Sequence, residues 1–168
     1  MKIILYMATS IDGLIATEDS NSDWVSPSDV PIFTDKINTA GCVIMGKRTY
    51  DHYYGEMFPM ANVLNVVISQ TPHTSEHENV IYLTDYTQIK PQLSERGLQE
   101  AILIGGGVTN GLFINAGLID EIFLSVHPLV LGKGIRLFEN YAQQLPLKFL
   151  AAVPKESDLV QLHYQVQH

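Results

Sequence analysis

A run of three glycines is the first feature of this chain that could bind a ligand. Gly105, Gly106 and Gly107 stand between an expected strand at 101–104 and an expected helix at 108–116. A helix that begins on residues without side chains exposes its first backbone N–H groups, which bind phosphate and other anions. A tight turn that requires positive φ angles is the alternative. The anion site predicted here comprises Ile104, Gly105, Gly106, Gly107, Val108 and Thr109.

A second turn of the same kind contains Gly46, Lys47, Arg48 and Thr49, directly after an expected strand at 42–45. Its sequence resembles a P-loop, but Arg48 replaces the required serine or threonine, so we do not expect nucleoside-triphosphate hydrolysis. Two separate phosphate-binding turns indicate a dinucleotide. Since Arg48 followed by Thr49 suits an adenosine 2′-phosphate, the expected cofactor is NADPH. A solvated, charged helix start is the alternative for either turn alone.

Asp29 is the candidate acid. Ser26 and Pro27 predict a helix start, with Ser26 as N-cap, and Asp29 follows the cap by three residues, directly after Trp24 and a polar loop at 17–23. As the third residue of a capping box, Asp29 has a complete structural explanation. The functional alternative is a carboxyl group in an apolar pocket that binds or protonates a nitrogen heterocycle. The spacing alone favours neither.

Other catalytic arrangements find little support. His73 and His77 are four residues apart, but they lie in a polar loop without a third ligand, so no metal site is expected. The order of the residues does not support a serine or cysteine nucleophile with a histidine base.

The composition predicts one globular domain over residues 1–168, with 46% apolar and 17% charged residues. The net charge of −8 argues against a nucleic acid or an anionic membrane as partner. No apolar run is long enough to span a bilayer. Cys42 is the single cysteine, which excludes an intrachain disulfide and favours the cytoplasm.

Apolar runs that alternate with helical patterns predict a three-layer α/β/α sandwich. Its central sheet should be mixed and mostly parallel, and a C-terminal antiparallel hairpin should complete it. Strands are expected at 2–8, 42–45, 64–69, 80–83, 101–104, 121–126, 147–153 and 159–166, with only a brief apolar segment at 14–16, and helices are expected at 27–40, 47–56, 86–96 and 108–116.

These motifs resemble the dihydrofolate reductase family, and most closely the RibD C-terminal group, the reductase domain of the riboflavin-biosynthesis deaminase/reductase. The resemblance rests on 43–50 (VIMGKRTY), 104–107 (IGGG) and 24–29 (WVSPSD), whose W-x-x-P-x-D spacing places the active-site acid of dihydrofolate reductases. The stretch 105–138 is more similar to the riboflavin-type reductase. This resemblance favours Asp29 as the acid.

The resemblance implies further site residues and a homodimer. It implies that Ala8, Ile15, Ser69 and Gln70 hold the two ends of the cofactor, and that Phe33, with Trp24 beside it, lines the substrate site. Val63 stands where folate reductases carry the arginine that pairs with the glutamate tail of folate, and the zinc motif of a deaminase domain is absent.

We therefore expect NADPH-dependent reduction of a C=N bond, or a related carbonyl, in a small pterin- or aminopyrimidine-like heterocycle. The resemblance to the riboflavin-type reductase implies 5-amino-6-(5-phosphoribosylamino)uracil as one candidate substrate. A non-catalytic NADPH-binding or sensor protein on the same fold is the alternative function.

Overall fold

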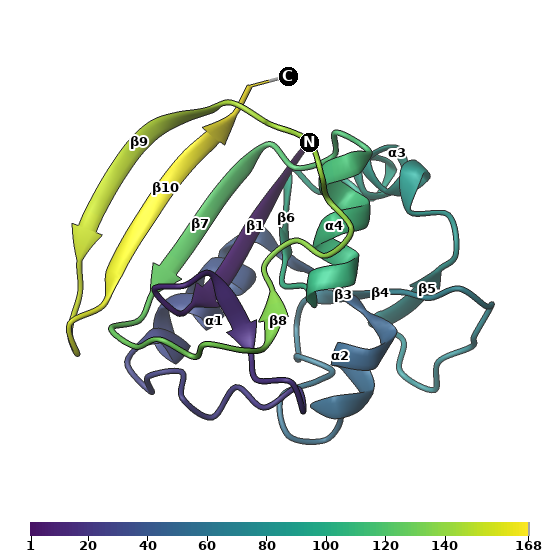
Figure 1. Cartoon of the computed structure of the whole chain (residues 1–168). Coiled ribbons are helices and arrows are strands. Elements are labelled where there is room, and N and C mark those ends of the chain that lie inside the picture. The colour runs from purple at the N-terminus through teal and green to yellow at the C-terminus, as the bar shows by residue number, and fades with distance from the viewer. Residues whose placement is uncertain (168) are drawn as a thin grey trace.

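An eight-stranded sheet runs through the protein, as the computed structural model of residues 1–167 shows (Figure 1). The strand order is β5-β4-β3-β6-β1-β7-β10-β9. Neighbours from β5 to β7 are parallel, whereas β10 is antiparallel to both β7 and β9. The strands are β1 (Lys2–Thr9), β3 (Cys42–Gly46), β4 (Leu64–Ile68), β5 (Val80–Leu83), β6 (Glu100–Leu103), β7 (Glu121–Val126), β9 (Leu147–Pro154) and β10 (Val160–Val166).

Helices cover both faces of this sheet, which confirms the expected dihydrofolate reductase-like sandwich. One buried cluster contains Ile37 and Ala40 of α1 together with Val43, and the other contains Leu93 of α3 and Phe113 of α4. Figure 1 accordingly shows α4 in front of the sheet and α1 behind it. The helices are α1 (Asp29–Ala40), α2 (Lys47–His52), the 3₁₀ turn η1 (Tyr86–Gln88), α3 (Ile89–Glu95) and α4 (Gly107–Asn115).

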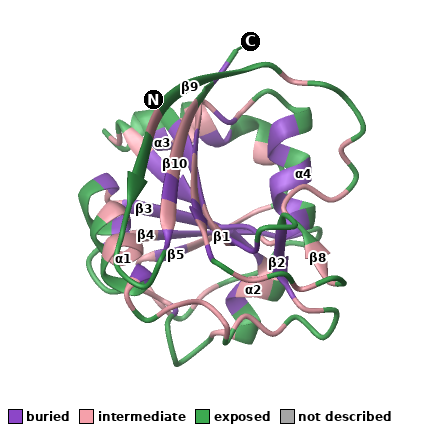
Figure 2. Ribbon diagram, turned by 60° about the vertical axis from the view of Figure 1, so that its left-hand side comes forward, coloured by how far each residue is buried: buried purple, intermediate pink, exposed green. Residues whose placement is uncertain are grey.

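The central strands are apolar because both of their faces are buried. All five residues of β3 are buried, and Ile4 of β1 lies opposite Ile102 of β6 in register. In contrast, β9 forms one edge of the sheet and is exposed over nearly its whole length (Figure 2).

The helix starts and ends differ from the sequence prediction. Helix α1 begins at Asp29 and not at Pro27, and no side chain caps it, because the Ser26 hydroxyl accepts a hydrogen bond from the Ser28 N–H (3.3 Å) instead of closing a capping box. Helix α2 ends at His52, short of residue 56. The small antiparallel sheet of β2 (Leu14–Ala16) and β8 (Ile135–Arg136) includes a strand that was not expected.

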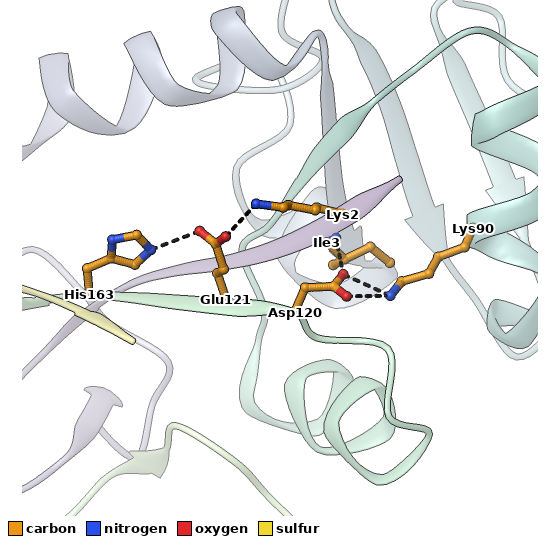
Figure 3. Close-up of polar contacts among 6 residues, drawn as sticks. All are labelled: Lys2, Ile3, Lys90, Asp120, Glu121 and His163. Atoms are coloured by element: carbon orange, nitrogen blue, oxygen red, sulfur yellow. Dashed lines mark hydrogen bonds and ion pairs between the residues drawn. The ribbon is translucent and has the colours of Figure 1, made fainter. Parts of the chain in front are cut away.

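Two carboxylates at the start of β7 hold the amino end of the sheet (Figure 3). Asp120 accepts a hydrogen bond from the Ile3 N–H (2.7 Å) and pairs with Lys90 of α3 (2.8 Å). Glu121 lies between Lys2 of β1 (2.7 Å) and His163 of β10 (2.8 Å). These contacts tie β1 to α3, β7 and β10 at this end of the sheet.

Candidate functional site

A cavity of about 890 Å³ lies at the carboxyl ends of β1, β3 and β6. This is where ligands bind in open α/β sheets, and the volume is within the usual range for ligand sites. The lining comes from the ends of these strands, the loop at 17–23, α1, the region around α2, and the start of α4. The lining residues are Tyr6, Met7, Ala8, Ile15, Ala16, Glu18, Asp19, Ser20, Ser22, Asp23, Val25, Asp29, Val30, Phe33, Arg48, Thr49, His52, Tyr53, Met57, Phe58, Ile104, Gly106, Gly107, Val108, Ile135, Glu139 and Asn140.

The three consecutive glycines have three different causes. Gly105 has a φ of +93°, which favours glycine, and is joined to Gly106 by a cis peptide bond. At Gly107 a side chain would collide with the backbone carbonyl of Arg136. At Gly106 a Cβ atom would fit, 3.6 Å from the Thr49 hydroxyl, and this residue lines the cavity. Backbone conformation therefore explains Gly105 and packing explains Gly107, whereas Gly106 presents bare backbone to the cavity.

The start of α4 has free hydrogen-bond donors at this end of the cavity. Within residues 1–167, the backbone N–H groups of Gly107, Val108 and Thr109 have no acceptor, because the first bond of the helix runs from the Asn110 N–H to the Gly106 carbonyl (3.0 Å). Such N–H groups attract anions.

Two side chains from the turn after β3 join the start of α4. Thr49 Oγ1 accepts a hydrogen bond from the Gly106 N–H (3.0 Å), which leaves the hydroxyl hydrogen of Thr49 available, and Arg48 lines the same cavity. Glu139 also lies here, where its carboxylate accepts a hydrogen bond from the Arg136 N–H (3.0 Å). This end of the cavity can bind an anionic group through backbone N–H groups, a hydroxyl and a guanidinium.

Asp29 lines the cavity as a buried carboxylate and is only 3% exposed. Its Oδ1 accepts hydrogen bonds from the hydroxyls of Tyr6 and Ser125, both at 2.7 Å. Gln161 donates in turn from Nε2 to the Tyr6 oxygen (3.0 Å). Burial, followed by the hydrogen bond to Asp29, raises the pKa of the Tyr6 hydroxyl, so Tyr6 keeps the proton that it donates.

This arrangement distinguishes the two oxygens of Asp29. Because Oδ1 already accepts two hydrogen bonds, the other oxygen, Oδ2, is the one left for a ligand or a proton. In the part of the chain that the structure describes, no protein group donates a hydrogen bond to Oδ2. A carboxylate fixed in this way can bind a heterocycle N–H group or transfer a proton.

The wall beside Asp29 is apolar. Val30 and Phe33 come from α1, and Met57 and Phe58 come from the segment after α2. Val30 is 45% exposed although it is apolar, because its side of α1 faces the cavity. The site thus combines a polar anion end, a buried carboxylate and an apolar wall.

The structure brings many of the predicted site residues together. Those that line the cavity are Ala8, Ile15, Asp29, Phe33, Arg48, Thr49, Ile104, Gly106, Gly107 and Val108. The others are not among the lining residues: Trp24, Gly46, Lys47, Ser69, Gln70, Gly105 and Thr109.

Each residue outside the lining has another environment. Lys47 pairs with Asp51 one turn along α2 (2.6 Å), and Gly46 packs against the Thr109 side chain. Trp24 packs edge-on against the ring of His127, with 5.2 Å between the ring centres.

Two further residues lie beyond β4. Ser69 is buried and accepts a hydrogen bond from the Thr71 N–H (3.3 Å), and Gln70 is exposed.

His127 supports the loop that leads into α1. Its Nε2 accepts a hydrogen bond from the Ser26 N–H (3.0 Å), so its Nδ1 carries the hydrogen and donates to the Ser125 carbonyl (2.9 Å). This pairing requires the neutral imidazole. His127 thereby links the strand that carries Ser125 to the loop that precedes Asp29.

Tyr6, Ser125 and Gln161 were missed by the sequence analysis. Their signal was a polar side chain within a strand that is otherwise apolar, since buried polar groups need hydrogen-bond partners. The loop carboxylates Glu18 and Asp23 were missed as well, because nothing in their order shows that they face a cavity.

Metal and membrane features were also searched for. No cluster of three or more histidine, cysteine or acidic side chains suited to a metal ion occurs among residues 1–167. Over the same residues, no helix is sufficiently long and apolar to cross a membrane.

Comparison with known proteins identifies the family. The family model of the RibD C-terminal domain matches residues 1–160. The uncharacterized protein YwjB of Bacillus subtilis (strain 168) is 30% identical over 169 residues, which cover 97% of each chain. A Shewanella sp. PV-4 protein named for riboflavin biosynthesis superposes with a TM-score of 0.85 at 26% identity over the whole of both chains. Enterococcus faecalis dihydrofolate reductase, solved with NADP(H) and RAB-propyl, has a TM-score of 0.75 at 17% identity and covers 99% of this chain and 97% of its own. The chain therefore belongs to the RibD C-terminal domain family.

Proposed function

We propose that this protein is an NADPH-dependent reductase that reduces a C=N bond, or a related carbonyl, of a pterin- or aminopyrimidine-like molecule. One observation carries the proposal: a single cavity contains both the buried carboxylate of Asp29 and the start of α4, whose first N–H groups have no acceptor among residues 1–167. An acid and an anion-binding end in one space are what such a reduction requires.

The residues of the anion end fit the phosphates of the cofactor. Arg48, the Thr49 hydroxyl and the first N–H groups of α4 would hold these phosphates, and Ala8 and Ile15 would contact the nicotinamide. NADPH supplies the hydride when it is bound. The fit rests on Gly106, whose bare backbone lets an anion approach, and on the three N–H groups that have no acceptor within residues 1–167.

Asp29 would orient the heterocycle and hold the transferred proton. Tyr6 and Ser125 both donate to Oδ1, so a proton on this carboxyl group resides on Oδ2. Phe33 and the neighbouring apolar wall would exclude water from this part of the cavity. The protein would thus position the substrate and supply the proton that accompanies hydride transfer from the cofactor.

Further parts of the proposal concern the whole molecule. Residues 1–168 would act as one domain in the cytoplasm, a compartment supported by the single, buried, free Cys42. The chain would form a homodimer through the exposed edge strand β9, which carries apolar side chains.

The test is steady-state oxidation of NADPH by the purified protein with a panel of dihydropterins and aminopyrimidines. Turnover with any of them supports the reductase. NADPH binding without turnover of any compound favours a non-catalytic NADPH-binding protein, and the absence of nucleotide binding contradicts both functions.

A further inference from the structure

Carboxylates dominate the charge of the cavity. Five line it, namely Glu18, Asp19, Asp23, Asp29 and Glu139, against Arg48 as the one lysine or arginine in the lining. The Thr17 hydroxyl donates a hydrogen bond to Asp19 and holds its pKa below the usual range, so this residue stays charged at neutral pH. Within residues 1–167, no lysine or arginine other than Arg48 lines this cavity, although Glu18 of the loop at 17–23 also borders a second depression that contains Lys133 and Arg136.

This loop is fixed close to the substrate end. The hydroxyls of Ser22 and Tyr53 are 2.5 Å apart and hydrogen-bonded, which ties the loop to the residue that follows α2. In Figure 1 the segment between β2 and α1 reaches toward α2 before it returns to α1. Asp23 accepts a hydrogen bond from the Asn21 side chain (2.7 Å) and lines the cavity next to Ser22.

The nearby wall, as far as the described residues 1–167 form it, consists of apolar side chains. Val30 and Met57 are 45% and 39% exposed, respectively, and both line the cavity with Phe33. Val63, at the position where folate reductases carry an arginine, is buried in the core. Lys133 and Arg136 line a separate depression of about 430 Å³, together with Asp12 and Glu18.

We propose that the substrate end of the cavity accepts an uncharged heterocycle with an apolar substituent, and rejects substrates that carry a phosphate or carboxylate tail. The inference rests on the proposed function and narrows it. Oδ2 of Asp29, which has no donor from residues 1–167, binds the heterocycle, and the loop carboxylates with the Val30–Met57 wall select its substituent. An anionic tail would lie among like charges without a counterion, which is unfavourable.

A matched pair of ligands tests this selection. NADPH is titrated first, and the saturated protein is then titrated calorimetrically with 2,4-diamino-5-benzylpyrimidine and with its 4-carboxybenzyl analogue. We expect the carboxylate analogue to bind at least about tenfold more weakly. The difference should shrink as salt is raised, because the loop carboxylates are exposed to solvent.

Variants that remove charge from the loop at 17–23 test whether its carboxylates cause the difference in affinity between the two pyrimidines. In the triple variant Glu18→Gln/Asp19→Asn/Asp23→Asn the ratio of the two affinities should fall to about threefold or less. The control variant Glu76→Gln/Glu78→Gln/Glu95→Gln removes the same number of charges from exposed positions outside the cavity lining and should keep the full ratio. The single variant Glu18→Gln leaves the Thr17–Asp19 and Asn21–Asp23 contacts of the loop in place and should lower the ratio partially.

The outcomes separate this inference from the proposed function. Bound NADPH with equal affinity for both pyrimidines, or with tighter binding of the carboxylate analogue, overturns the inference and leaves the reductase in place. Bound NADPH without binding of either pyrimidine also overturns it. A protein that binds no NADPH fails the proposed function itself.

Discussion

Tyr6 donates a hydrogen bond of 2.7 Å to Asp29, so the central strand β1 fixes the candidate acid on α1. Because the Tyr6 oxygen also accepts from Gln161, its loss leaves Gln161 Nε2 without this acceptor and Asp29 Oδ1 with a single donor. We expect Tyr6→Phe to lower the free energy of unfolding by about 1–3 kcal/mol and to slow turnover. Chemical denaturation and steady-state kinetics measure the two effects.

Tyr164→Phe is the matched control for Tyr6→Phe. Tyr164 lies on β10, outside the cavity lining, and its hydroxyl has no hydrogen bond to any residue from 1 to 167. Its loss should change the stability by less than about 0.5 kcal/mol. Equal effects of the two substitutions would contradict the role that we give to the Tyr6 hydroxyl.

Asp29→Asn tests the acid directly. The amide cannot deliver a proton, so we expect kcat to fall by about 100- to 10,000-fold while the Kd for NADPH stays nearly constant. Asp35→Asn, at an exposed position of the same helix, serves as the control and should leave both quantities unchanged. Unchanged turnover in Asp29→Asn would remove Asp29 from the reaction.

The sequence indicated both ends of this site for different reasons. The turn at 105–107 could be predicted because glycine runs are rare and have a physical cause, although two of its glycines serve the backbone and the approach of Arg136. Asp29 was ambiguous because a capping box explains the same spacing. The structure removes this alternative, since Asp29 opens α1 and its carboxylate accepts from Tyr6 and Ser125. That contact joins three residues that are far apart in the sequence, on α1, β1 and β7, so no local pattern records it.

Arg48→Ala tests the phosphate end. We expect the Kd for NADPH to rise by an amount equivalent to about 1–3 kcal/mol, because a cation that would hydrogen-bond to a phosphate of the cofactor is lost. If Arg48 binds the 2′-phosphate, the Kd for NADH should rise much less. Fluorescence titration that follows Trp24 measures both constants.

Lys47→Ala provides the comparison for Arg48. Lys47 is the adjacent cation, but it pairs with Asp51 and does not line the cavity, so its loss should change the NADPH affinity less than the loss of Arg48 does. A larger effect at Lys47 would transfer the phosphate role from Arg48 to Lys47.

Alkaline pH should destabilise the fold through groups that are buried in the neutral form. Burial raises the pKa of the Cys42 thiol from 9.0 to about 12, and burial likewise raises the pKa of Tyr50 from 10.0 to about 12. Each of these groups holds its proton more tightly in the folded protein than in the unfolded chain. Its contribution to the free energy of unfolding is therefore complete below its pKa in the unfolded chain, and it is lost as the pH rises through its pKa in the folded protein. We therefore expect the free energy of unfolding to fall above about pH 9, by up to about 1.4 kcal/mol per pH unit for each group.

Denaturation midpoints between about pH 8 and about pH 11 measure this loss. Cys42→Val should make the loss of stability smaller, since Cys42 has the lower unfolded-state pKa of the two groups and its contribution begins to fall at the lower pH. In the native protein near pH 8 the thiol should resist a disulfide reagent such as dithiobisnitrobenzoate, and it should react once the chain is unfolded. Rapid labelling of the native protein would show that Cys42 is accessible.

The strands of the sheet were largely predictable from the sequence, whereas the residues at which the helices begin and end, and the short strand β8, were not. Strands such as β3 and β6 are continuous apolar runs because helices cover both faces, and such runs are visible in the sequence. β8 was not expected because two residues form no pattern and depend on pairing with β2. The early end of α2 at His52 was not visible either, and the residue that follows, Tyr53, is hydrogen-bonded to Ser22, which is distant in the sequence.

The edge strand β9 is where we expect two copies to meet. Its outer side has no partner strand within residues 1–167, and Phe149 remains 58% exposed although its ring packs edge-on against Tyr164. An exposed edge with apolar side chains is a template for pairing with another strand. Phe149→Glu should therefore shift a dimer toward monomer in sedimentation velocity experiments. Val130→Glu, which places the same charge on an exposed apolar residue away from β9, should leave the dimer intact, and a wild-type protein that is monomeric at all concentrations would contradict this interface.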